Sequence, residues 1–199
     1  MFKPLFALAL AAALVAGCAE KGKESPTAEI NAAIHQNSGP PRLTLITMIN
    51  NRSGAGAHSA LLVESSQSVL FDPAGSFEHK ALPERGDVLY GMTPAWIERY
   101  ISAHARAEFH VVRQEISVTP AQAARALQLV QANGPVSSAF CANATSGLLK
   151  QIPGFEGIRQ GFYPLKLMDQ VANLPNVKTT KHFEDDAGNV RDGVANLAD

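Results

Sequence analysis

The chain has 199 residues, of which 46% are hydrophobic and 18% charged, a balance typical of a globular protein rather than of a disordered or fibrous chain. The 17 Lys and Arg residues against 18 Asp and Glu residues leave a net charge of −1. The chain lacks the excess of basic residues found in most nucleic-acid-binding proteins, so we expect no nucleic-acid partner. Two cysteines are too few for a disulfide framework.

The N-terminal segment has the layout of a secretory signal peptide, which would not be part of the mature fold. A lysine near the start precedes an apolar run over residues 5–15. Residues 14–18 (Leu-Val-Ala-Gly-Cys) then resemble a bacterial lipobox, which implies removal of residues 1–17 and acylation of Cys18. Several acyl chains hold a protein stably on a membrane, and Ala19 favours the outer membrane by analogy. The alternative is an ordinary signal peptide followed by an unrelated cysteine.

The remaining chain divides into a tether, one domain and a tail. Residues 18–41 have loop chemistry, with a Gly-Pro-Pro run at their end, and only residues 28–35 have the pattern of one or two helical turns. Residues 42–185 are long enough for one domain with a sizeable core. The polar residues 186–199 are expected to be a tail.

The first half of this domain is expected to be rich in strands. Residues 43–49 are apolar and β-branched, and two further short runs, 58–63 and 68–72, predict a hairpin joined by residues 64–67. The segment 74–87 reads as loop, and residues 88–90 as a short strand.

Helices dominate the second half of the domain. Thr93-Pro94 and Thr119-Pro120 each combine an N-cap with a first-turn proline, and Gly134 ends the second of these helices. The other predicted elements are a strand at 108–117, a helix capped by Ser137 or Ser138 and running to residue 150, a helix at 164–173, and a strand at 177–183. The predicted strands and helices do not alternate regularly along the chain, so we expect an α+β fold with a mainly antiparallel sheet.

Cys141 stays as a free thiol if Cys18 is acylated. A lone cysteine in an oxidising compartment has no disulfide partner. Its expected place near the start of a helix would stabilise a thiolate through the helix dipole and free N–H groups. The small and apolar neighbours suit a nucleophile, and they suit a buried structural cysteine as well.

His58 offers a base for such a nucleophile. It opens a strand directly after the small residues 54–57, and a turn centred on residue 65 would put it opposite Asp72 in the hairpin. A carboxylate beside an imidazole holds its tautomer and stabilises the imidazolium, as the third member of a catalytic triad does. A register slip of one residue would remove Asp72 from this role, and Glu64 and Gln67 are the substitutes in the same hairpin.

The order of these residues resembles a known family. Histidine comes first, at a strand start, and cysteine follows at a helix start, as in the circularly permuted branch of the NlpC-type papain-like superfamily, which includes lecithin:retinol acyltransferase-like proteins. The resemblance covers residues 42–172 and is carried by residues 58–63, 71–73, 85–88 and 140–143. Many relatives have Asn directly before the cysteine, where this chain has Phe140.

The resemblance implies a papain-like cysteine hydrolase, a peptidase, amidase or acyl transferase, acting on an amide or ester. Cys141 would attack the carbonyl carbon, His58 would transfer the proton, and Asp72 would orient His58. The backbone N–H of Cys141 would help to bind the oxyanion. The substrate would be a cell-wall peptide or a lipid, with the location favouring peptides. The rival hypothesis is a non-catalytic envelope lipoprotein that uses the same fold to bind a lipid or a protein.

The other histidines have simpler interpretations. His110 lies inside an apolar strand, and His104 ends a helix, where a cation would suit the helix dipole. No histidine pair has a zinc-ligand spacing, and the Gly-Ala-Gly of residues 54–56 lacks the rest of a phosphate-binding loop. We therefore expect neither a metal nor a cofactor.

Overall fold

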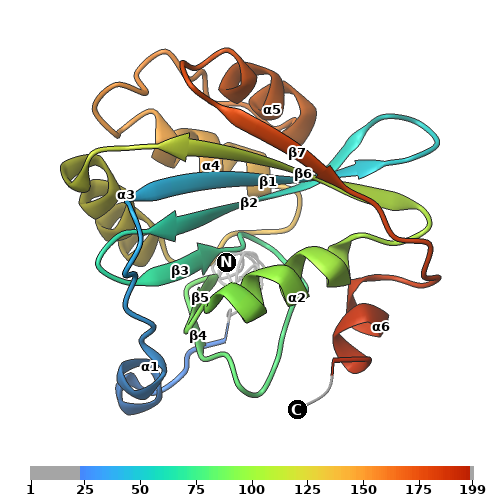
Figure 1. Ribbon diagram of the computed structural model, residues 1–199, viewed down its shortest axis with the longest axis horizontal. Helices are drawn as coiled ribbons and strands as arrows, with labels where there is room; N and C mark the ends of the chain where they lie inside the picture. The colour runs from blue at the N-terminus through green and yellow to red at the C-terminus, as the bar shows by residue number, and fades with distance from the viewer. Residues whose placement is uncertain (1–22, 198–199) are drawn as a thin grey trace, which may run out of the picture.

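The computed structural model describes residues 23–197 and shows one seven-stranded sheet with helices on both faces (Figure 1). The strand order is β4-β5-β3-β2-β1-β6-β7, and every pairing is antiparallel. The strands are β1 Arg42–Asn50, β2 Gly56–Glu64, β3 Ser68–Phe71, β4 Glu84–Arg85, β5 Val88–Tyr90, β6 Phe109–Ser117 and β7 Lys178–His182. The helices are α1 Thr27–Ala33, α2 Pro94–His104, α3 Pro120–Asn133, α4 Cys141–Leu149, α5 Pro164–Ala172 and α6 Val190–Ala195. The predicted α+β class and antiparallel sheet are confirmed.

The sheet separates two hydrophobic cores. Successive side chains of a strand point to opposite faces, so in β2 Leu61 and Val63 enter one core while Ala60 and Leu62 enter the other. Helices α3, α4 and α5 cover the first face, and α2 and α6 cover the second (Figure 1). The central residues of β1, β2 and β3 are buried on both faces, so these strands read as nearly continuous apolar runs, whereas β7 is exposed.

The two threonine-proline signals start helices as predicted. Thr93 accepts a hydrogen bond from the Trp96 N–H, and Thr119 forms a capping box with Gln122. Gly134 ends α3 with a φ of 73°, a conformation open to glycine at little cost. The predicted serine cap of the next helix is wrong, because α4 begins at Cys141 with Phe140 as its N-cap.

The segments predicted as tether and tail pack against the domain where they are described. Ile30 of α1 is 7% exposed and belongs to the first core, and Ser25 pairs with Glu84 through a backbone hydrogen bond. At the other end, Val190 of α6 is buried in the second core beside α2. Both segments are short and polar overall, and a single buried apolar residue in each makes no periodic hydrophobic pattern from which a packed helix could be predicted. The predicted signal peptide and Cys18 lie outside the described residues.

The hairpin register differs from the prediction by two residues. Leu61 pairs with Phe71 and Glu64 with Ser68, so the turn is centred on Ser66. Continuing that register puts Asp72 opposite Ala60 instead of His58. An even shift preserves the face of every side chain, and Asp72 therefore still points to the same side of the sheet as His58.

Among the described residues, no helix is both long and apolar enough to cross a membrane.

Candidate active site

The site lies where β2 runs beyond the end of its neighbour. Strand β3 stops at Phe71, opposite Leu61, so the first residues of β2 have no partner on that side. On the other side, the β1–β2 register shifts between Met48 and Ile49, which marks a β-bulge directly before His58. Bulges often re-aim side chains next to functional sites. The His58 side chain is 15% exposed at this opening.

A turn after β3 presents the Asp72 carboxylate to His58. The Gly75 N–H donates to the Asp72 carbonyl at 2.9 Å, and Ala74 between them has a φ of 56°, the pattern of a type II turn. Asp72 Oδ1 lies 2.6 Å from His58 Nε2 and accepts the Tyr100 hydroxyl at 2.7 Å. A Cβ at Gly75 would lie only 1.9 Å from Asp72 Oδ2, so the carboxylate position depends on this glycine.

Cys141 enters the site from the opposite layer, on the first residue of α4. The Phe140 N–H donates to the Ser137 carbonyl at 3.2 Å, and Ala139 has a φ of 69°, a left-handed conformation that costs about 1–3 kcal/mol for a residue other than glycine. This tight turn starts the helix at the cysteine. Cys141 is 7% exposed.

The Cys141 thiol lies beside the His58 ring, and each group shifts the pKa of the other. Because His58 Nε2 faces Asp72, the ring nitrogen left for the sulfur is Nδ1. The backbone N–H groups of Ser59 and Ala142 also favour the charged form of the sulfur. Burial alone would raise the pKa of Cys141, but His58 and these two N–H groups outweigh it and hold the pKa below its usual value of 9.0.

The charges of His58 and Asp72 stabilise each other. Burial alone would lower the pKa of His58, but the Asp72 carboxylate, together with Cys141, raises it to about 10. Burial would likewise raise the pKa of Asp72, and the His58 charge and hydrogen bond, with help from Tyr100, hold it below its usual value. Cys141, His58 and Asp72 thus form a row in which the imidazolium is favoured at neutral pH and the thiolate is favoured more than in an ordinary cysteine.

His104 supports this row as a neutral group. Its Nδ1 lies 2.8 Å from the Tyr100 carbonyl, and its ring centroid lies 4.1 Å from that of Tyr100 and 6.0 Å from that of His58. Burial lowers the pKa of His104 to about 4. The interpretation of His104 as a cation that interacts with the helix dipole is therefore wrong, because the side chain is only 3% exposed.

Asp87 ties the two halves of the site together. Its Oδ2 accepts the Ala74 N–H at 3.0 Å, in the turn that carries Asp72, and the Val136 N–H at 2.8 Å, in the loop that leads to Cys141. Burial raises the pKa of Asp87, and the two backbone hydrogen bonds oppose that rise. Asp87 thus holds the carboxylate turn and the cysteine loop at a constant separation.

The first turn of α4 offers donors for a developing negative charge. The first N–H groups of a helix lack partners within the helix. The Phe140 N–H donates to the Ser137 carbonyl, and the Ala142 N–H favours the charged form of the Cys141 sulfur. No described residue accepts the Cys141 N–H, which is the donor predicted for the oxyanion.

One group of described side chains has the composition of a metal site. The ligand atoms of His58, Asp72 and His104 lie within 4.8 Å of one another. Two ligands of one tetrahedral zinc ion lie about 3.3 Å apart, whereas the His58–Asp72 distance is 2.6 Å and the same Asp72 oxygen also binds Tyr100. The group is joined by hydrogen bonds and does not fit a metal ion as it stands.

The structure brings Cys141, His58 and Asp72 together and leaves the substitute residues elsewhere. Glu64 pairs with Arg42 at the far end of β2, with an Oε2–Nε distance of 2.6 Å. Gln67 lies in the hairpin loop.

The sequence did not place Tyr100, His104 or Asp87 in the site. Tyr100 and His104 are one helical turn apart, so they share a face of α2, but that spacing equally fits a plain core. Asp87 lies in one of the segments that resemble the family.

Comparison of the chain with protein-family models, with curated proteins and with solved structures found no match. The family resemblance therefore remains a prediction from the sequence.

Proposed function

We propose that the protein is a papain-like cysteine hydrolase or acyl transferase of the circularly permuted type. The observation that carries the proposal is the continuous chain of contacts from Cys141 through His58 to Asp72. A buried structural cysteine has no reason to contact a histidine that is itself bound to a buried carboxylate. The depressed pKa of Cys141 and the raised pKa of His58 support the same conclusion, because perturbed pairs of this kind gather at catalytic sites.

The reaction follows from the charges of the pair. The Cys141 thiolate attacks the carbonyl carbon of an amide or ester, and the Cys141 N–H donates to the oxygen that becomes negative. The bond from carbon to the leaving nitrogen or oxygen breaks as His58 gives that atom its proton. A thioester remains on Cys141. Water or an acceptor group then attacks the thioester, His58 accepts the proton, and the thiolate returns.

Asp72 and Tyr100 act through His58. The Asp72 carboxylate fixes the ring so that Nδ1 faces the sulfur and stabilises the imidazolium. The Tyr100 hydroxyl donates to the same Asp72 oxygen and keeps the carboxylate in place. Tyr100 is therefore a positioning residue.

The location of the enzyme is part of the proposal. Acylated Cys18 would anchor it at the periplasmic side of the cell envelope, with the outer membrane favoured. Cell-wall peptides and membrane lipids would both lie within reach there.

The experiment that tests the proposal is capture of the thioester. The purified protein is incubated with activated esters and with cell-wall peptides, quenched in acid, and analysed by intact mass spectrometry. We expect an acyl adduct on Cys141 that is lost in Cys141→Ala and fails to form in His58→Ala. His110→Ala is the matched control, because His110 lies on β6 and bonds Asn51 at 2.7 Å.

The non-catalytic alternative makes the opposite prediction. A lipoprotein that only binds a lipid or a protein would form no adduct with any substrate. Its Cys141 would then react with thiol reagents at the rate of an ordinary buried cysteine.

A further inference from the structure

The chain before the sheet forms a strap along one side of the domain. We call residues 23–37 the strap; they run from the edge strand β4 to the turn between β2 and β3 (Figure 1, blue). The Ser25 N–H donates to the Glu84 carbonyl at 2.8 Å, and the Glu84 N–H donates to Ser25 Oγ at 3.1 Å. At the far end, the Ser68 N–H donates to the His35 carbonyl at 2.9 Å. Hydrogen bonds thus fix the strap to the domain at both ends.

Buried contacts hold the middle of the strap. Ile30 of α1 is buried in the first core. The Ala33 carbonyl lies so close to Gly91 that a Cβ built on this glycine would be 2.8 Å from the carbonyl oxygen. Flexible linkers make no such contacts and behave as random coils. The strap is therefore part of the folded domain and does not act as a spacer.

Only a short piece of chain can then separate the proposed lipid anchor from the domain. Residues 19–22 are all that lies between Cys18 and the first residue of the strap, Lys23. A fully extended chain spans at most about 3.6 Å per residue, so Lys23 lies within about 18 Å of Cys18. The edge of the sheet at β4, which pairs with the start of the strap, is the part of the domain that this short connection holds nearest to the bilayer.

The surface at this edge suits lipid headgroups rather than the bilayer interior. Charged residues of both signs occupy the start of the strap and the neighbouring segment 78–85: Lys23, Lys80 and Arg85 against Glu24, Glu29, Glu78 and Glu84. Attraction to anionic lipids needs a basic excess, and insertion needs an apolar face. Within the strap, Ile34 is the one exposed large apolar side chain. The acyl chains would therefore supply the attachment, and this edge would rest on a zwitterionic headgroup surface.

The strap also limits how far the proposed catalytic site lies from the bilayer. Strands β4, β5 and β3 are neighbours in the sheet, and Asp72 follows β3 directly. Neighbouring strands are about 4.8 Å apart. Chain and sheet together then separate Asp72 from Cys18 by about 40 Å at most.

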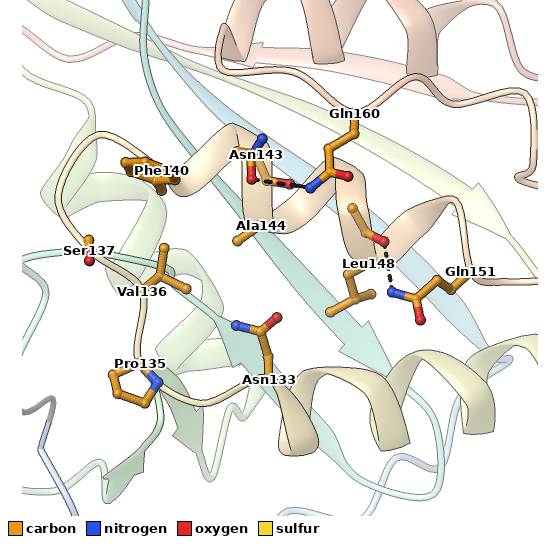
Figure 2. Close-up of a pocket in the computed structure, with 11 residues that line it drawn as sticks. Asn133, Pro135, Val136, Ser137, Phe140, Asn143, Ala144, Leu148, Gln151 and Gln160 are labelled. Carbon is orange, nitrogen blue, oxygen red and sulfur yellow. Dashed lines mark hydrogen bonds between the residues drawn. The ribbon is translucent and has the colours of Figure 1, made fainter. Parts of the chain in front are cut away.

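The groove nearest to Cys141 sets no such limit. It lies between α3 and α4, has a volume of about 400 Å³ and ends at Phe140 (Figure 2). Neither Cys141 nor His58 is among its described lining residues. The groove does not show where a substrate of this site lies, whereas the strap restricts it through the length of the chain.

We infer that the strap holds the domain with its β4 edge against the headgroup surface of the bilayer, so that the site acts on bonds within about 40 Å of that surface. The inference rests on the proposed acylation of Cys18. It narrows the substrates of the proposed enzyme to molecules on the membrane or directly beside it.

The test compares energy transfer from two fluorescent labels to a lipid acceptor. Protein acylated at Cys18 is reconstituted into phosphatidylcholine vesicles, with a donor–acceptor pair whose range is shorter than the width of the sheet. Asn31→Cys carries the label on α1, and Thr179→Cys carries it on β7, at the opposite edge of the sheet and about 29 Å from β4. Both positions are exposed and uncharged, and Cys141→Ala in both proteins removes the competing thiol. We expect several-fold more transfer from the Asn31 label.

A longer connection is the matched control. A Gly/Ser linker of about twelve residues between residues 22 and 23 keeps the strap and the acyl chains but lets the domain turn and move away. Transfer from the Asn31 label should then fall towards that from the Thr179 label.

The outcomes separate the inference from the proposed function. Equal transfer from the two labels, or transfer that the linker leaves unchanged, would overturn the docked orientation in protein that is acylated and bound to vesicles. Transfer between Asn31 labels on neighbouring copies would assign the β4 edge to a second copy and overturn the lipid surface. Protein without acyl chains by mass spectrometry would overturn the proposed anchor and the inference with it, while the thioester experiment would still test the cysteine chemistry.

Discussion

Replacing Asp72 with Asn is the most informative single change in the site. Asparagine keeps the size of the side chain and can still accept the Tyr100 hydroxyl, but it removes the negative charge that His58 faces at 2.6 Å. Burial of His58 remains, and burial lowers the pKa of an imidazole. We expect the pKa of His58 to fall from about 10 to its ordinary value of 6.5 or below. The imidazolium should be lost at neutral pH, and with it the charge that lowers the pKa of Cys141.

The size of the effect follows from the pKa of His58. A rise from 6.5 to about 10 corresponds to roughly 5 kcal/mol, at about 1.4 kcal/mol per unit. Because the folded pKa is the higher one, this stabilisation is fully present below pH 6.5 and is lost as the pH rises towards 10. Asp72 has a lowered pKa, so its contribution is lost as the pH falls below 3.8. Asp72→Asn should be less stable near pH 6 and should lose little more stability on the alkaline side.

The assay is the rate of Cys141 alkylation by iodoacetamide against pH, with urea unfolding at each pH. At about pH 6 an ordinary thiol is less than 1% thiolate, so Asp72→Asn should react more slowly than the unmodified protein there, by up to about a hundredfold, and at a similar rate near pH 9. Glu184→Gln is the control, since His182 and Glu184 form a similar pair at 2.7 Å on the surface. Equal pH profiles for Asp72→Asn and the unmodified protein would refute the charge argument.

Three more changes test separate parts of the structure. Gly75→Ala should push the Asp72 carboxylate aside, because the added Cβ would lie 1.9 Å from Oδ2, and should shift the alkylation profile towards that of Asp72→Asn; an unchanged profile would contradict the turn geometry. Tyr100→Phe removes one hydrogen bond to a buried carboxylate, which should lower the free energy of unfolding in urea by about 1–3 kcal/mol. The pH profile of Cys141 alkylation, measured in parallel, should report a slightly lower pKa of His58. A loss of stability with no change in this profile would make Tyr100 merely structural. Cys18→Ala should abolish acylation and release the protein from membranes, as followed by fractionation and mass spectrometry, with the domain still folded; retention through detergent-free washing would remove the main support for the lipid anchor.

Local sequence chemistry determined much of the scaffold around the site. Thr93 and Thr119 start their helices because a hydroxyl cap and a first-turn proline act within one turn of the chain. The face shared by His58 and Asp72 also follows from sequence, since strand alternation has a period of two and survives the two-residue error in the predicted register.

Contacts between distant segments decided the chemistry of the site. The approach of Cys141 to His58 depends on β3 ending at Phe71 and on Asp87 tying the turn of Asp72 to the loop at Val136, and no local pattern encodes either. His104 has the same residue type and helix position whether it is exposed or buried, and only its burial makes it neutral. A pKa or a hydrogen bond depends on everything packed around a group, so for these residues sequence could supply the candidates and only the tertiary structure their roles.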